Sequence, residues 1–479
     1  MHSEEPRFES PLSTRYASKE MLKIFSSEYR YSIWRKLWVA LARAQRNLGL
    51  PIRAEQVLAM EKKVHDIDFK RVAYYEKQLG HDVMAHIHAF GDVCPEAKGV
   101  IHLGATSCYI TDNTDLYLMK EGLKIIKEKL VDTIRNLSTQ AESYADLACL
   151  SYTHLQTAQP TTVGKRMCLW LQDLLMDLQD LIATQEQLYF FGVKGATGTQ
   201  ASYMALFEEN PHKIQKLEEM IAEEMGFTKI LPISGQTYTR KQDVRIINCL
   251  CSIAVSAHKF GTDIRLLAHM KEMEEPFGEK QVGSSAMPYK RNPNRSERMC
   301  GLARFLLSLQ ANPIYTAATQ WLERSLDDSS NRRLSLPEAF LAADSIINLY
   351  HYISSNLVVY PKIIEHHLKE EIGFLGTEHI LTASFNKGQD RQVIHEALRV
   401  HSQTVAKKWK EEGIKEDLLK LISEDPLFSL TYQELQEALD PMHFVGRAPE
   451  QVREFLKKEI KPILNRHEQV QAYNLNIQI

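Results

Sequence analysis

The stretch of sequence that decides the fold runs from residue 112 to residue 146 and reads DNTDLYLMKEGLKIIKEKLVDTIRNLSTQAESYAD. It contains no proline and a single glycine. Apolar side chains recur in it at steps of three or four residues, at Leu116, Met119, Leu123, Ile126, Leu130, Ile134 and Leu137. Such steps place one apolar seam along a helix. The stretch therefore predicts a helix of about 33 residues, roughly 50 Å long.

Four further segments repeat this pattern, so we expect the central part of the chain to be a bundle. They are residues 162–190, 241–273, 293–320 (interrupted at Asn312-Pro313) and 335–357. Five helices of matched length predict one elongated bundle and an all-α fold. A single copy would leave much apolar helix surface exposed, so we expect several copies of the chain to pack together. The alternative is a monomeric helical array.

Shorter amphipathic helices are expected on both sides of this bundle, for example at residues 29–48, 391–411 and 449–464. We place domain boundaries near residues 106 and 360. The prediction is an N-terminal helical domain (1–106), a central five-helix domain (107–359) and a C-terminal helical domain (360–479).

The composition excludes several classes of protein. The 479 residues hold only 21 Gly and 17 Pro, which favours long helices over short strands joined by tight turns. The formal net charge of -3 provides no overall basic field for nucleic acid. No apolar run approaches the roughly 18–20 residues of a membrane helix, and the acidic N-terminus lacks the apolar segment of a signal peptide. Seven scattered cysteines without a C-x-x-C pair predict reduced thiols in the cytoplasm, with neither disulfides nor zinc.

The most informative loop is residues 277–293, FGEKQVGSSAMPYKRNP, between two predicted long helices. Long loops inside compact domains are usually functional or disordered. The Gly-Ser-Ser sequence offers a mobile backbone with exposed hydroxyls, and Lys290 could stabilise developing negative charge. The alternative is a solvated surface loop with incidental charges.

Other polar clusters also precede or join the long helices. Residues 104–107 (GATS) come just before the first long helix, with Thr111 and Asp112 as candidate caps, and a helix N-terminus suits a carboxylate or phosphate. The alternative is simple capping. His154 lies in a polar turn, SYTHLQTAQP (151–160), where a histidine could act as an acid or base. A structural or exposed histidine is the alternative there.

Two more clusters hold titratable or cationic groups. His81 and Asp82 form a dyad compatible with a helix, but HDVMAHIH is not the H-E-x-x-H motif of a zinc protease. The segment 321–333, WLERSLDDSSNRR, carries arginines whose planar donors suit carboxylate or phosphate, unless it is only a solvated charge run. The glycines of GVKGATGTQAS (192–202) lack the strand and the G-K-[ST] ending of a phosphate-binding loop.

Residues 283–293, GSSAMPYKRNP, closely resemble the signature G-S-S-x-M-P-x-K-x-N-P of the fumarase/aspartase superfamily. The alanine after the serines and the arginine after the lysine look like its adenylosuccinate lyase branch. Further segments resemble the animal-type form of that branch: RYAS, HDVMAH, IHLGATSCY, THLQTAQPTTVGKR, TGTQAS, GQTYTRK and LDDSSNRR. The resemblance covers nearly the whole chain.

This resemblance implies an all-helical subunit of three domains and a homotetramer whose central helices form a shared bundle. It implies that each active site combines segments of three subunits, and that no cofactor or metal takes part. The implied reactions release fumarate from adenylosuccinate, giving AMP, and from the succinylocarboxamide precursor SAICAR, giving AICAR. Both reactions belong to purine nucleotide biosynthesis.

The resemblance also implies roles for individual residues. Ser284 is the expected general base and His154 the expected general acid, with Lys290 stabilising the serine alkoxide. His81 is expected to assist the acid, and Glu297 to pair with His154. The expected substrate-binding residues are Arg15, Tyr16, Gly80, Asp82, His102, Thr106, Ser107, Thr153, Gln236, Asn292, Arg298, Arg324, Ser329 and Arg333. Many relatives carry a side chain where Gly80 stands, so only a backbone contact is possible at that position.

Two alternatives stay open at this stage. A carboxymuconate cycloisomerase-like enzyme shares M-P-x-K-R-N-P, but the arginines of 324–333 and the GQTYTRK segment argue against it. A structural, crystallin-like protein has no need of Ser284, Lys290, His154 and His81.

Overall fold

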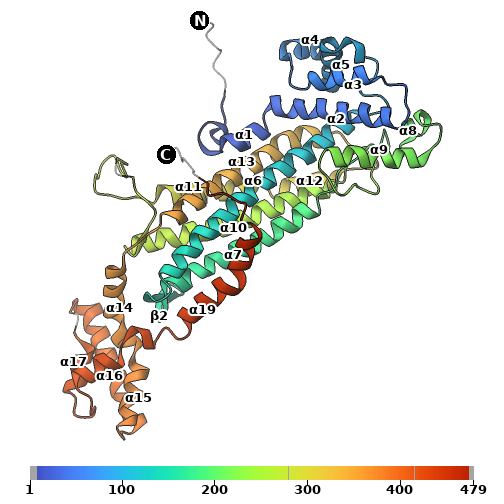
Figure 1. The fold of residues 1–479 in the computed structure, drawn as a ribbon. Coiled ribbons are helices and arrows are strands. Elements are labelled where there is room, and N and C mark those ends of the chain that lie inside the picture. Colours follow the sequence, from blue (N-terminus) through green and yellow to red (C-terminus); the bar gives the residue numbers. More distant parts are fainter. Residues whose placement is uncertain (1–7, 279, 415, 474–479) are drawn as a thin grey trace.

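The computed structural model describes residues 8–278, 280–414 and 416–473, which form an elongated helical molecule around a central bundle (Figure 1). Helix α6 packs against α7 and α13, and α10 packs against α7, α11 and α13. The seam that runs from Leu116 to Leu137 is completely buried, which confirms the predicted helical periodicity. The bundle helices are α6 (Ser107–Ser143), α7 (Val163–Glu186), α10 (Lys241–His269), α11 (Asn294–Ser308) and α13 (Asp328–Ser355).

Shorter helices lie at both ends and along the sides of this bundle. Helices α3 to α5 gather at one end, and α14 to α17 gather at the opposite end (Figure 1). The N-terminal helices are η1 (Leu12–Tyr16), α1 (Lys19–Ile24), α2 (Ser27–Asn47), α3 (Ala54–Lys62), α4 (Phe69–Leu79), α5 (Asp82–Val93) and η2 (Pro95–Ala97). Three more join the long helices: α8 (Ala201–Leu206), α9 (Pro211–Glu224) and α12 (Ala311–Thr319).

The C-terminal part is also helical and has a small core of its own. Buried apolar residues between Leu368 and Ala448 form that core together with Ala148 and Leu150, whereas one continuous core joins the N-terminal helices to the bundle. The division into three domains at residues 106 and 360 stays a prediction. The C-terminal helices are α14 (Pro361–Leu375), α15 (Thr377–Asn386), α16 (Arg391–Glu412), α17 (Leu418–Glu424), α18 (Tyr432–Ala438), η3 (Pro441–His443), α19 (Ala448–Phe455), η4 (Leu456–Ile460) and α20 (Lys461–Arg466).

Two predicted helix ends differ from the structure. Helix α6 begins at Ser107, so the prediction that Asp112 caps it is wrong: Asp112 lies inside the helix and is 1% exposed. Its carboxylate accepts hydrogen bonds from Arg240, a partner that sequence spacing cannot reveal. The helix interruption expected at Asn312-Pro313 falls slightly earlier, because Pro313 fits into the first turn of α12.

Two small antiparallel sheets interrupt the helices. Strands β1 (Ala148–Thr153) and β2 (Gln156–Thr162) form a hairpin between α6 and α7, and β3 (Met273–Glu274) pairs with β4 (Val358–Val359). The hairpin turns at His154 and Leu155, whose φ angles of 55° and 54° are typical of a type I′ turn. The predicted polar turn around His154 is therefore the tip of a β-hairpin.

Other expectations from the composition can be compared with the structure. All seven cysteines are free thiols in the structure, and all of them are buried. In the part of the chain that the structure describes, no helix is long and apolar enough to cross a membrane.

The buried imidazole of His86 generates a prediction about acid stability. His86 is 3% exposed and lies against the rings of Tyr31 and Trp34. Burial and the nearby Arg35 charge lower the pKa of His86 to about 4. The unfolded chain therefore binds a proton at higher pH than the folded chain, and the stability present above about pH 6.5 is lost as the pH falls toward 4.

We expect His86→Phe to weaken this pH dependence by up to about 1.4 kcal/mol per pH unit between pH 6.5 and 5. Urea unfolding at several pH values and one protein concentration measures the slope. His366→Phe changes a histidine whose side chain is 67% exposed and serves as the control. An unchanged slope in His86→Phe would contradict the assignment.

Candidate active site

The signature loop 277–293 is clamped at its base by one buried carboxylate. Glu275, 4% exposed, accepts hydrogen bonds from the backbone N–H of Arg295 (3.0 Å) and of Ser296 (2.8 Å) and from the Ser296 hydroxyl (2.8 Å). It thereby caps the first turn of α11 with negative charge. Arg295 also donates to the Pro276 carbonyl (2.9 Å) and to the Gln281 side chain (3.0 Å). Both ends of the loop are therefore fixed to α11.

Within the loop, the hydroxyl of Ser284 receives two backbone hydrogen bonds. The N–H of Ala286 lies 3.3 Å from Ser284 Oγ, and the N–H of Met287 lies 3.1 Å away. Two backbone dipoles that converge on one oxygen stabilise negative charge there. Asn292 donates to the Gly283 carbonyl (2.7 Å) and holds the two halves of the loop together.

Five predicted residues lie in this loop or close to it. Arg298, on α11, lies 5.4 Å from the ring of Tyr16, and Arg15 belongs to the same short turn as Tyr16. Glu297 is exposed on the first turn of α11. Lys290 is also exposed, and among the described residues no hydrogen bond joins it to Ser284. The loop, Arg298 and Tyr16 form one group, which we call the loop group.

A second group forms where α5 begins. Asp82 pairs with Arg333 of α13 at 2.7 Å, and His81 Nδ1 lies 3.7 Å from the Asp82 carboxylate. Burial opposes ionisation of Asp82, but the hydrogen bond and charge of Arg333 keep the pKa of this carboxyl below its usual range. Gly80 ends α4 with a φ of 62°, a conformation that disfavours side chains and accounts for glycine at this position.

His102 lies close to His81 and has a defined tautomer. The indole N–H of Trp38 donates to His102 Nδ1 at 2.9 Å, so the ring carries its proton on Nε2. Burial, together with the charge of His81, lowers the pKa of His102 to about 4. At neutral pH this residue is therefore an uncharged hydrogen-bond donor.

The third group surrounds the start of α6, where Thr106 and Ser107 lie. Gln236 contacts this first turn through the Cys108 thiol, which is 3.7 Å from Gln236 Oε1. The backbone N–H of Gln236 donates to the Glu323 carbonyl (3.0 Å), and its side chain donates to the Ala196 carbonyl (3.0 Å). These contacts bring the loops around residues 196, 236 and 323 together.

Arg324 and Ser329 belong to this third group. Arg324 Nη1 donates to Asp328 at 2.7 Å, and its side chain is 20% exposed. Ser329 lies in the first turn of α13. The second and third groups share α13 through Arg333 and Ser329, and we call them together the α6–α13 groups.

The hairpin tip stands apart from all of these residues. Thr153 and His154 are exposed, and no hydrogen bond or ion pair among the described residues joins His154 to Glu297 or to the loop group. The pairing of His154 with Glu297 stays a prediction. One chain thus holds three separate parts of the expected site: the loop group, the α6–α13 groups and the hairpin tip.

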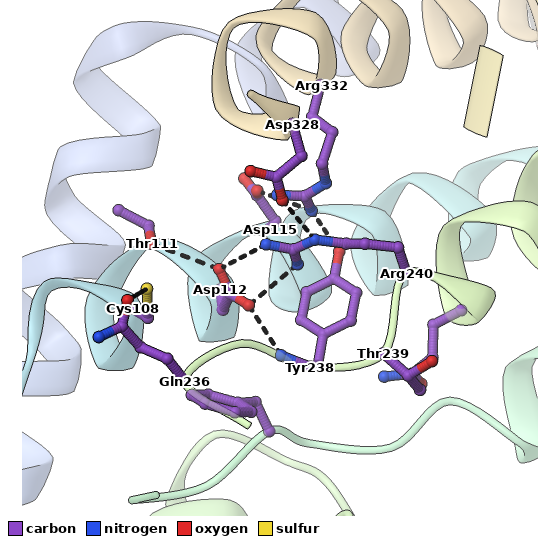
Figure 2. Close-up of polar contacts among 12 residues, drawn as sticks. Cys108, Thr111, Asp112, Asp115, Gln236, Tyr238, Thr239, Arg240, Asp328 and Arg332 are labelled. Carbon is purple, nitrogen blue, oxygen red and sulfur yellow. Dashed lines mark hydrogen bonds and ion pairs between the residues drawn. The ribbon is translucent and has the colours of Figure 1, made fainter. Parts of the chain in front are cut away.

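A buried ion network whose pairings the sequence spacing does not predict lies under the α6–α13 groups (Figure 2). Asp112 and Asp328 bond Arg240 within this network, and all three side chains are nearly inaccessible. Arg332, which looked like a ligand-binding arginine, is buried and pairs with Asp243 and Asp115 instead. The GQTYTRK motif, which contains Arg240, and the LDDSSNRR motif, which contains Asp328 and Arg332, pointed to this region but not to these pairings.

Comparisons with known proteins identify the family of this chain. Residues 14–306 match the family described as Lyase, and residues 373–455 match the one described as Adenylosuccinate lyase C-terminus. The adenylosuccinate lyase of Saccharomyces cerevisiae is 48% identical over 95% of both chains. That of Schistosoma mansoni is 46% identical over 98% of this chain and 99% of its own.

A solved structure shares the fold at lower identity. The 3-carboxy-cis,cis-muconate lactonizing enzyme of Pseudomonas putida has a TM-score of 0.81 and 25% identity, and the match covers 96% of this chain and 99% of that one. The cycloisomerase-like alternative thus has the same architecture but a much lower identity than the relatives above. The fold and the signature loop define a lyase of the fumarase/aspartase superfamily. Within it, the chain belongs to the adenylosuccinate lyase family.

The clamp on the signature loop generates a stability prediction. In Glu275→Gln an amide group replaces one oxygen that faces N–H donors, so we expect the free energy of unfolding to fall by about 1–3 kcal/mol. Thermal unfolding followed by circular dichroism measures the change. Glu297→Gln alters an exposed residue in the first turn of α11 and should leave the midpoint within about a degree of the unmodified protein. Equal midpoints in both variants would mean that Glu275 does not hold the loop.

Proposed function

We propose that this chain releases fumarate from adenylosuccinate, giving AMP, and from SAICAR, giving AICAR. The observation that carries the proposal is the environment of Ser284, a hydroxyl in the signature loop that accepts two backbone N–H groups. A serine has too high a pKa to act as a base unless its alkoxide is stabilised. The relatives named above, which are 46–48% identical, support adenylosuccinate as the substrate.

The proposed reaction is a β-elimination. Ser284 removes a proton from the carbon next to a succinyl carboxylate, and the resulting negative charge spreads into that carboxylate. The neighbouring C–N bond then breaks and the C=C bond of fumarate forms. His154 donates a proton to the departing nitrogen, with His81 assisting. Lys290 would approach the developing charge when the loop closes and water is excluded.

Positively charged and neutral donors would hold the anionic substrate. Arg324 Nη1 donates to the Ser325 carbonyl and to Asp328. Among the described residues no hydrogen bond involves its Nη2, which would donate to a phosphate or carboxylate oxygen of the substrate. His102 Nε2–H supplies an uncharged donor. Thr106, Ser107 and Gln236 complete this part of the proposed site, while Arg15, Tyr16, Arg298, Ser329 and Arg333 would bind the nucleotide.

We further propose a cytoplasmic homotetramer whose active sites are shared between subunits. Large apolar side chains are exposed on the bundle helices, including Leu169 (48%) and Met176 (58%) of α7 and Val255 (56%) of α10. Contacts with further copies would remove this apolar surface from water. The same assembly would bring the hairpin tip of one subunit to the loop group of another.

Turnover of adenylosuccinate by the purified protein tests the proposed reaction, and the loss of ultraviolet absorbance follows it. Ser284→Ala should keep the fold and lower the rate by about 10³-fold or more, because it removes the general base. Ser308→Ala removes a hydroxyl at the far end of α11 and serves as the control. No turnover by the unmodified protein would reject the proposed function, and near-normal turnover by Ser284→Ala would reject Ser284 as the base.

A further inference from the structure

Arg240 lies at the centre of the ion network shown in Figure 2. It immediately precedes α10 and is 3% exposed. Its Nη1 donates to Asp112 of α6 at 2.9 Å, and its Nε donates to Asp328 of α13 at 2.7 Å. One guanidinium group therefore joins two long helices through two buried carboxylates.

Each of these carboxylates also fixes a segment of the proposed site. Asp112 accepts the backbone N–H of Tyr238 at 2.9 Å, two residues after Gln236. The second oxygen of Asp328 accepts Arg324 Nη1 at 2.7 Å. The contacts of Arg240 thus extend through Asp112 to the backbone segment that carries Gln236. They extend through Asp328 to the side chain of Arg324.

The two segments are held together by a further contact. The N–H of Gln236 donates to the carbonyl of Glu323, the residue before Arg324. A side chain at Gly235 would collide with the Glu323 carbonyl, so the two backbones approach too closely for any larger residue. A shift of either segment would therefore move both Gln236 and Arg324.

The network is electrostatically matched. Burial penalises the charge of Arg240, but Asp112 and its other acidic neighbours raise the pKa of Arg240 above its ordinary value. Burial also opposes ionisation of Asp328, yet Arg240 and Arg324 lower the pKa of this carboxyl. Arg240 and Asp328 are therefore both charged at neutral pH, and removing one partner leaves a buried charge without its counterion.

A neighbouring arginine does not perform the same task. Arg332 bonds Asp243 at 2.8 Å, Asp115 at 3.1 Å and the Tyr238 hydroxyl. Within the described residues, no hydrogen bond joins Arg332 to Asp112 or Asp328. Arg240 is the residue that bridges the two carboxylates there.

We propose that Arg240 is a positioning residue for substrate binding, which sets the separation between Gln236 and Arg324 by bridging Asp112 and Asp328. The proposal rests on the proposed function of the site. A lysine cannot replace this geometry, because its single ammonium group lacks the planar fork that reaches two carboxylates at once.

The test compares Arg240→Lys with a control variant at another buried charged residue of the bundle. We expect Arg240→Lys to raise the KM for adenylosuccinate roughly 10- to 100-fold, since small displacements of binding groups cost factors of this size. The value of kcat should stay within about threefold, because Gln236 and Arg324 would bind substrate and transition state alike. Calorimetric titration with AMP should show a similar loss of affinity.

Asp132→Asn is the control. Asp132 is also a carboxylate of α6, is 1% exposed and accepts hydrogen bonds from Arg135 (2.5 Å) and His351 (2.7 Å). Neither Arg135 nor His351 belongs to the proposed site. The KM of the Asp132→Asn variant should therefore stay near that of the unmodified protein. If Arg240→Lys does not fold, Asp328→Asn decides instead: it keeps Arg240 charged, weakens the same bridge and should raise the KM in the same way.

Three outcomes separate the possibilities. A raised KM with a preserved kcat in Arg240→Lys, or in Asp328→Asn, supports the positioning role. A KM no higher than that of Asp132→Asn, or a loss confined to kcat, overturns it. Absence of turnover by the unmodified protein would instead reject the proposed function, and unchanged AMP binding in Arg240→Lys would then still count against the positioning role.

Discussion

The packing of α6 along α7 and α13 is the constraint on which the arrangement of the proposed site depends most. The apolar seam of α6 is buried from Leu116 to Leu137. Gly122 allows α6 to approach α13 closely, because a side chain there would meet the ring of Phe340 at 2.6 Å. A completely buried ion pair, Lys129 with Asp344 at 2.5 Å, links α6 to α13. Asp344 also accepts the backbone N–H of Ser18 at 2.6 Å and thus fixes the turn that carries Tyr16. The residues of the proposed site therefore lie mainly in the loops and first turns at the ends of these packed helices.

This rigidity explains why one chain holds the parts of the proposed site apart. The loop group is anchored to α11, the α6–α13 groups are anchored by the Arg240 network, and His154 sits on a hairpin between α6 and α7. Bending a packed bundle to join them would disrupt its core. Association of rigid subunits, as we propose, would join them without deforming any helix. A shared site and an exposed apolar bundle surface are then two consequences of the same architecture.

The sequence predicted the long helices well, because a seam with steps of three and four residues depends only on local geometry. It predicted His154 and Ser284 as candidates through short polar motifs, but not the hairpin that carries His154. It assigned Asp112 to a helix cap, whereas the residue is a buried counterion of Arg240, 128 positions away in the chain. It also missed Glu275, whose role becomes visible only once α11 is folded beside it. Ion pairs and hydrogen bonds between residues far apart in the chain form only when the helices pack, so the periodicity of the sequence does not reveal them.

Recombination of two inactive variants tests the shared site most directly. His154→Ala and Ser284→Ala each remove one part of the site, and subunit exchange between them can produce a site in which both residues are intact. The account predicts that the mixture regains a measurable part of the fumarate-releasing activity that neither variant has alone. Complete absence of activity after exchange has been demonstrated, for example by mass spectrometry of differently labelled subunits, would contradict it.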